Sequence, residues 1–342
     1  MRRTRSVRLL AVLLTAGLVL AACSGDEEPQ AEPTPTEEVT PEPEPEPEFW
    51  PLTGLEVTDG DPAAHPPLIV KIDNTAAAAP QVGLSGADIV VEQMVEGGLT
   101  RLAVMFHSEL PTEVGPVRSL RATDIGIAKP VGGILVASGG AHETLDRLRR
   151  AQVPLIEEGA NGITRSSSRR ATYNVLADLA VIADDVVAGS GTRLPYDGGR
   201  PDDYLPWGEA ADLPEGEVAT QLQVRYPSQN TRWEFTDDGY VNTNSHAAEG
   251  DRFVADTVLV VRVEVIDAGY TDAAGNRVPE LRFEGTGEAQ LFHDGQMVKG
   301  RWSKETVASA LTLRSGGADL VVPAGRTWIH LLPVNNASVL HE

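Results

Sequence analysis

Hydrophobic and polar residues follow two kinds of pattern between Leu68 and Val187. Several short stretches are β-branched or alternate between apolar and polar residues, which is typical of strands; they span 68–72, 88–95, 101–107 and 133–138. Three others have the composition of helices and span 119–129, 141–152 and 174–187. In the second, Leu145 and Leu148 lie three residues apart, as on one face of an amphipathic helix. The patterns predict an α+β, or mixed α/β, domain over residues 49–190.

After Ala219 the helix-like patterns nearly disappear. Short apolar or alternating runs predict strands over 222–226, 232–235, 257–266, 289–293, 296–302, 311–314, 319–322 and 326–332. Asp294-Gly295 separates two of them and favours a tight hairpin, because the type I′ turn needs positive φ at both central residues. We predict a smaller, mostly antiparallel β domain over 219–335. A connecting segment rich in Gly, Pro and Asp (191–218) would precede it, and a short tail (336–342) would follow.

The first 22 residues have the composition of an export signal. Four arginines precede an apolar stretch at 9–20 that is too short to span a membrane stably. The sequence LAAC at 20–23 resembles a bacterial lipobox, where cleavage precedes a cysteine that is then acylated; the alternative is an ordinary signal peptide. Cys23 is the single cysteine of the chain, so no disulfide framework can form. We predict an exported lipoprotein, anchored in the lipid bilayer at the outer face of the cell membrane through acylated Cys23.

Residues 23–48 form a different kind of segment, dominated by proline and glutamate. Residues 24–48 contain no aromatic residue and only one sizeable aliphatic, Val39, so they cannot bury enough apolar surface to fold. We therefore predict a disordered tether of about 80 Å when fully extended. The whole chain carries a formal net charge of −22, and it stays acidic without the ten acids of the tether. Such a charge excludes nucleic acid and anionic lipid surfaces as general partners.

The sequence VGPVRSLRATDIG at 114–126 is the first candidate binding site. Ser119 is placed to cap a helix after the Gly-Pro turn, and the free N–H groups of a helix start attract anions. Arg118 and Arg121 beside that start would complete a site for phosphate or carboxylate. The alternative is that both arginines pair with neighbouring acids such as Glu113 and Asp124.

Two further loops have a similar character. Ser138, Gly139 and Gly140 lie between a predicted strand and a predicted helix, where α/β domains tend to bind ligands. The basic run 165–170 contributes Arg169 and Arg170 and precedes Asn174. Together these residues form a hypothetical anion site, provided that the three loops meet in space.

Catalytic and metal signals are weak by comparison. Ser138 lacks the Gly-x-Ser-x-Gly pattern of a hydrolase elbow, although His142 follows it by one helical turn. The seven histidines lack the short spacings of zinc sites, and neither a P-loop nor a dinucleotide fingerprint occurs. We therefore predict no catalytic residue, no metal site and no cofactor.

Several motifs together resemble those of the YerB-like bacterial lipoproteins, a family of unknown function with N-terminal and C-terminal halves. They include KIDN at 71–74, GPVRSLR at 115–121, SGG at 138–140, the run 285–304 and GRTWIHLLP at 325–333. The resemblance implies a polar cluster onto which Arg118, Ser119, Arg121, Arg170 and Asn174 map. Where relatives tend to have Pro-His-Asn, this chain has Thr172-Tyr173-Asn174, so a role for that histidine does not transfer.

Three hypotheses follow. The first is a non-catalytic binding module for an anionic ligand of the cell envelope, which could belong to peptidoglycan, another wall polymer or a partner protein. The second is a phosphotransferase or hydrolase acting on wall precursors, with an acid such as Asp124 or Glu92; residues 85–107 have some similarity to the LytR–CpsA–Psr phosphotransferases but lack their fuller motifs. The third makes the arginines a buried network of ion pairs that stabilises the fold.

Overall fold

The computed structural model describes residues 47–190, 196–272 and 274–342, and residues 46–342 form one compact unit. Cys23, the signal and all but the last two residues of the tether lie outside the described residues. Among the helices that are described, none is long and apolar enough to cross a membrane.

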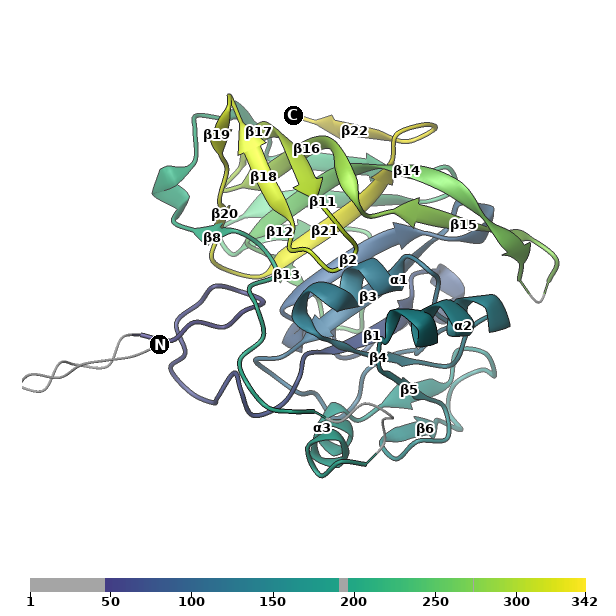
Figure 1. The fold of residues 1–342 in the computed structure, drawn as a ribbon. Helices are drawn as coiled ribbons and strands as arrows, with labels where there is room; N and C mark the ends of the chain where they lie inside the picture. The colour runs from purple at the N-terminus through teal and green to yellow at the C-terminus, as the bar shows by residue number, and fades with distance from the viewer. Residues whose placement is uncertain (1–46, 191–195, 273) are drawn as a thin grey trace, which may run out of the picture. The chain divides into compact units, whose positions relative to one another are not determined.

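Most strands belong to one large sheet (Figure 1). The first half of the chain contributes β1 (Leu68–Asp73), β2 (Ile89–Met94), β3 (Thr100–Phe106), β4 (Ile134–Ala137) and β5 (Leu155–Glu157). The second half contributes β14 (Thr257–Thr271), β16 (Gly285–His293), β17 (Gln296–Lys304), β18 (Thr312–Ser315), β19 (Ala318–Asp319) and β21 (Thr327–Pro333). Their order is β19-β18-β17-β16-β14-β21-β2-β3-β1-β4-β5, with β15 (Arg277–Arg282) paired to β14 and β9 (Glu217–Val218) paired to β17.

The two halves meet where β2 pairs with β21 in parallel. Val90 lies opposite Trp328, Val91 opposite Ile329 and Glu92 opposite His330. Both strands are almost entirely buried, which fits their apolar composition, because a parallel strand in the middle of a sheet is covered on both faces. The boundary between the predicted domains stays a prediction, but hydrogen bonds of one sheet cross from one half to the other.

The alternation of side chains gives the large sheet two covered faces. On one face, Val90 and Trp328 belong to a core that includes Trp233 of the second sheet and Ile182 of α3. On the other face, Val91 and Ile329 belong to a core that includes the helical residues Ile127 and Leu148. Glu92 therefore points toward the second sheet, since it lies two residues from Val90.

The second sheet has five strands in the order β13-β12-β11-β10-β22. They span β13 (Val254–Ala255), β12 (Gly239–Asn242), β11 (Asn230–Thr236), β10 (Gln221–Arg225) and β22 (Ser338–His341). Two small ladders complete the strands, β6 (Ile163–Arg165) with β7 (Val175–Ala177) and β8 (Trp207–Gly208) with β20 (Val322–Pro323). The predicted fold class is confirmed, and so is the hairpin at Asp294-Gly295, whose φ angles are 48° and 69°.

The α-helices are short: α1 (Asp124–Ala128), α2 (His142–Ala151) and α3 (Leu179–Val187). Single 3₁₀ turns lie at η1 (Ala76–Ala78), η2 (Leu84–Gly86), η3 (Glu96–Gly98), η4 (Lys129–Val131) and η5 (Ala210–Asp212). Two predictions were wrong here. The helix expected over 119–129 begins only at Asp124, so Ser119 is not its cap. The helix expected over 174–187 divides into strand β7 and α3, because Asp178 caps α3 by accepting a hydrogen bond from the Val181 N–H.

Candidate functional site

The loops singled out in the sequence meet around Arg118. The Ser138 N–H donates to the Arg118 carbonyl (3.1 Å), and the Leu120 N–H donates to the Gly139 carbonyl (2.9 Å). The Arg118 side chain reaches the third loop, where Nη1 donates to the Thr172 carbonyl (3.0 Å) and the guanidinium lies over the Tyr173 ring. Ser119 contributes its carbonyl, which accepts from Arg101 Nη1 (2.8 Å).

Three cations of this region, Lys71, Arg118 and Arg121, are already paired with carboxylates. Arg121 is buried and forms a bidentate ion pair with Glu96, with distances of 2.7 Å from Nε to Oε1 and 2.6 Å from Nη2 to Oε2. Arg118 Nε lies 2.9 Å from Asp73 Oδ2. Lys71 Nζ donates to Asp124 Oδ1 (2.8 Å), and the other carboxylate oxygen accepts from the Arg121 N–H. Asp124 thus occupies the place that an anion was expected to take at the start of α1.

The remaining predicted residues lie on the loop that carries Thr172. Arg169 Nη1 donates to the Pro80 carbonyl (2.8 Å), and Arg170 is exposed. Asn174 Oδ1 accepts from Arg165 Nη1 (2.7 Å). The anion contacts proposed for these residues stay predictions. Arg118, whose side chain is 20% exposed, connects this loop to the rest of the predicted cluster.

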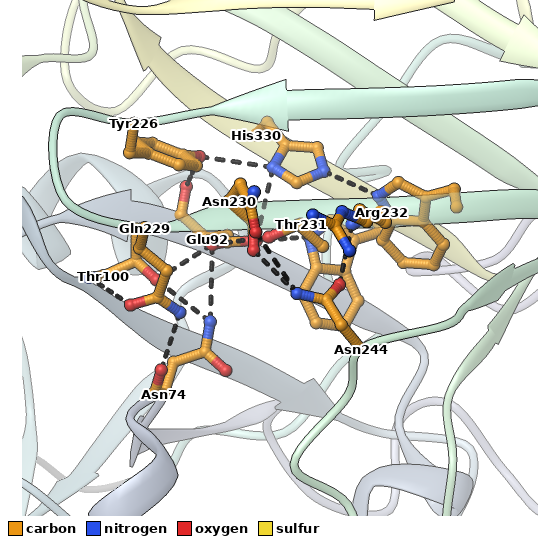
Figure 2. Close-up of polar contacts among 12 residues, drawn as sticks. Asn74, Glu92, Thr100, Tyr226, Gln229, Asn230, Thr231, Arg232, Asn244 and His330 are labelled. Carbon is orange, nitrogen blue, oxygen red and sulfur yellow. Dashed lines mark hydrogen bonds and ion pairs between the residues drawn. The ribbon is translucent and has the colours of Figure 1, made fainter.

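Glu92 is the centre of a second polar group, buried between the two halves (Figure 2). Its Oε1 accepts from Thr100 Oγ1 (2.9 Å), Thr231 Oγ1 (3.0 Å) and Asn74 Nδ2 (3.3 Å). Its Oε2 accepts from Thr231 Oγ1 (2.9 Å) and Trp328 Nε1 (3.3 Å). The carboxylate is therefore enclosed by donors from both halves of the chain.

His330 completes this group from the neighbouring strand. The Trp233 indole, which can only donate, points Nε1 at His330 Nε2 (3.2 Å), so that ring nitrogen must be the acceptor. The proton of the neutral ring then lies on Nδ1, 3.3 Å from Glu92 Oε2 and 3.2 Å from the Tyr226 hydroxyl. Tyr226 in turn donates to the Glu92 carbonyl (3.2 Å).

Burial controls the titration of both groups. It raises the pKa of Glu92 to about 7, although hydrogen bonds from Thr100, Thr231, Trp328 and Asn74 oppose the shift. It lowers the pKa of His330 to about 3, so the ring stays neutral near pH 7. The pair is thus a polar link between β2 and β21 rather than an ion pair.

A polar cavity of about 240 Å³ lies next to Glu92. It is lined by residues that carry hydrogen-bonding side chains: Asn74, Ser228, Gln229, Asn230, Thr231, Asn242, Asn244 and His246. Asn74 follows β1, whereas the others come from the β10–β11 turn, from β11 and from the end of β12 with its loop. Larger hollows exist, one of about 470 Å³ along β10, β11 and β22. The smaller cavity is notable because its wall residues Asn74 and Thr231 bond a buried carboxylate.

Sequence reasoning missed most of this cavity. Its asparagines lie in two short polar runs, SQNT at 228–231 and NTNSH at 242–246, which read as ordinary turns. An acid in the interior of the apolar run IVVEQMV was the available signal for Glu92. Among the described residues, no group of three or more His, Cys, Asp and Glu side chains could hold a metal ion.

Comparison with known proteins places the chain in a family. Residues 52–192 match the N-terminal domain, and residues 216–329 the C-terminal domain, of the proteins of unknown function DUF3048. The chain belongs to the DUF3048 family. It is 26% identical over 305 residues to the Bacillus subtilis (strain 168) protein named "Putative lipoprotein YerB", covering 85% of this chain and 88% of that one.

The fold also matches that of a solved relative. The crystal structure of YerB from Bacillus subtilis superposes with a TM-score of 0.70 at 23% sequence identity, covering 85% of this chain and 99% of that one. The resemblance predicted from the motifs is thereby confirmed. The DUF3048 domains are described as having unknown function, so the family match does not indicate an activity for this chain.

The pair Arg121–Glu96 provides a test of the structural role of the arginines. Arg121→Ala should lower the free energy of unfolding by about 3–5 kcal/mol, because it leaves the buried Glu96 carboxylate without its partner. Arg170→Ala, at an exposed position, should change it by less than about 0.5 kcal/mol. Urea unfolding of both variants measures the difference, and equal stabilities would contradict a structural role for Arg121.

The buried carboxylate predicts a pH-dependent difference in stability between wild type and Glu92→Gln. The pKa of Glu92 is raised from 4.5 to about 7 on folding, so the folded protein keeps a proton that the unfolded chain has lost in this window. Relative to Glu92→Gln, wild type should therefore lose about 3 kcal/mol of stability as the pH rises from 4.5 to 7. His330 is common to both proteins, and its opposite contribution cancels in the difference. Parallel pH profiles in urea unfolding would contradict the assignment.

Proposed function

We propose that this DUF3048 protein is a non-catalytic, lipid-anchored binding protein that holds a segment of a cell-envelope polymer, such as peptidoglycan, in its polar cavity. The observation that carries the proposal is the lining of that cavity. Its residues come from both halves of the chain, and two of them, Asn74 and Thr231, are fixed by the buried Glu92. Residues fixed before a ligand arrives lose little conformational entropy on binding.

Arg118 is the proposed contact for an anionic group of the same polymer. Its guanidinium is partly exposed, and its partner Asp73 directly precedes Asn74 of the cavity. Gln81 joins the two positions by donating from Nε2 to the Asp73 carbonyl (2.8 Å) and to Asn74 Oδ1 (3.1 Å). Arg169 and Arg170 lie on the neighbouring loop and would extend this positive edge. The predicted contribution of Arg121 is weaker, because its charge is neutralised by Glu96.

Binding is favoured over catalysis by the surroundings of Glu92. A general acid or base must come within hydrogen-bond distance of the group that reacts. Glu92 has no exposed surface, and its oxygens are occupied by side chains of both halves. Asp124 is equally buried and paired with Lys71. The two acids considered for an enzyme are therefore held in the folded core.

The proposed location rests on Cys23 and on the relative whose name describes it as a lipoprotein. Cys23→Ser should release the protein from the membrane, because acyl chains contribute about 0.8 kcal/mol per buried methylene. Fractionation of cells producing each form measures the change. A Cys23→Ser protein that still sediments with membranes would contradict anchoring by the lipid.

The proposed function predicts binding of the full chain to isolated envelope polymers without turnover. Asn242→Leu should weaken binding about tenfold or more, since it removes a hydrogen-bonding amide from the cavity. Asn335→Leu, at an exposed position, is the matched control. Sedimentation with purified peptidoglycan and wall polymer measures affinity, and chromatography of the polymer detects cleavage or transfer. Absence of binding to any envelope polymer, or turnover of one, would overturn the proposal.

A further inference from the structure

Three asparagines of the cavity orient one another, and backbone N–H groups fix two of them. The Arg232 N–H donates to Asn244 Oδ1 (2.8 Å), so the other end of that amide is the NH₂ group. Asn244 Nδ2 donates to the Asn230 carbonyl (3.0 Å) and to Asn230 Oδ1 (3.4 Å). The Asn244 N–H donates to Asn242 Oδ1 (3.0 Å). Because backbone N–H groups can only donate, they identify the side-chain oxygens of Asn244 and Asn242. The NH₂ group of Asn244 then identifies the oxygen of Asn230, 3.4 Å away.

This arrangement leaves two amide nitrogens free. The oxygens of Asn230 and Asn242 accept from Asn244, and within the described part of the chain neither Nδ2 atom has a partner. Asn242 is only 8% exposed, and its NH₂ group faces the solvent-filled cavity rather than another side chain. The cavity therefore presents two preorganised hydrogen-bond donors.

The other two amides of the lining are already satisfied. Gln229 Nε2 donates to the Asn74 carbonyl (2.6 Å), and its Oε1 accepts from the Thr100 N–H (3.2 Å). Asn74 Nδ2 donates to Thr100 and Glu92, and its Oδ1 accepts from Gln81. These two residues form a fixed wall of the cavity and do not compete for a ligand.

Ser228 and His246 complete the lining with groups that can accept. Burial lowers the pKa of His246 below its ordinary value, so the ring is neutral near pH 7 and one of its nitrogens offers a lone pair. The Ser228 hydroxyl can also accept. A ligand that combines an acceptor for the two asparagines with a donor for His246 or Ser228 would use both kinds of group.

The charges around the cavity disfavour a carboxylate or phosphate inside it. No arginine or lysine lies among its lining residues. The buried Glu92 carboxyl bonds two wall residues, and Asp73 interacts electrostatically with His246. An uncharged acceptor is favoured over an anion in such surroundings.

We infer that the cavity binds a secondary amide group, whose carbonyl accepts from Asn230 and Asn242 and whose N–H donates to His246 or Ser228. The volume of about 240 Å³ corresponds to about eight water molecules, enough for an acetamido group and part of its carrier. The inference rests on the proposed function and names the group of the polymer that the cavity holds. The acetamido group of an amino sugar and the peptide bond of a cross-linking peptide share this chemistry.

Small probes separate this amide chemistry from other groups. Heteronuclear NMR titration of the full chain should detect binding of N-acetylglucosamine or N-acetylalaninamide, and the stronger of the two identifies the source of the amide. Glucosamine, which lacks the carbonyl, and acetate, which lacks the N–H and carries a charge, should bind at least tenfold more weakly. Acetate binding as tightly as both amides would overturn the inference.

Matched variants test the two donors. Asn242→Asp and Asn230→Asp each replace a donating NH₂ by an oxygen with little change of shape, and each should lower amide affinity at least tenfold. Asn335→Asp, exposed and outside the lining, should leave affinity unchanged. Thermal unfolding shows which variants remain folded, and unchanged affinity in a folded Asn242→Asp or Asn230→Asp protein would overturn the inference.

Failure of the inference is distinguishable from failure of the proposed function. Polymer binding that neither amide probe displaces would overturn the inference and leave the function standing. Amide probes that bind with the expected selectivity, while no envelope polymer does, would overturn the function and support the cavity chemistry.

Discussion

The parallel pairing of β2 with β21 is the constraint on which the rest of the structure depends. It joins two halves that are far apart in the sequence into one sheet and places Glu92 beside His330 in a fully buried position. A carboxyl group there must be surrounded by donors, because an unpaired buried charge is costly. Thr100, Thr231, Trp328 and Asn74 supply them, and two of these residues also line the cavity.

Three cations of the first half of the chain are also held by groups of opposite polarity. Lys71, Arg118 and Arg121 each form an ion pair with a different carboxylate, from Asp124, Asp73 and Glu96 respectively. The most exposed of the three, Arg118, is also the one that contacts a neighbouring loop through Thr172. The buried Arg121 therefore has a structural role, whereas the partly exposed Arg118 is the proposed binding residue.

The cavity is formed by residues from three separate segments of the chain rather than by one motif. The turn between β10 and β11 reaches the end of β1 through Gln229, whose side chain donates to the Asn74 carbonyl. Asn244 orients the side chains of Asn230 and Asn242. Uncharged donors in a fixed arrangement suit an amide, whereas the positive edge at Arg118 suits an acidic neighbour on the same polymer. The two proposals therefore describe adjacent contacts with one kind of ligand.

The class of fold, most of the strands, the hairpin at Asp294-Gly295 and the family could all be predicted from the sequence, because they depend on local periodicity, turn chemistry and contiguous motifs. It also identified the loops that meet at Arg118. The prediction that Ser119 caps a helix with a bound anion at its start was wrong, because the helix begins at Asp124 and the Asp124 carboxylate takes the place of the anion. No sequence pattern indicated that Asn230, Asn242 and Asn244 are joined by hydrogen bonds. These contacts emerge on folding, since the partner of a charge or an amide lies across the sheet or on another loop, and no local pattern encodes such a contact.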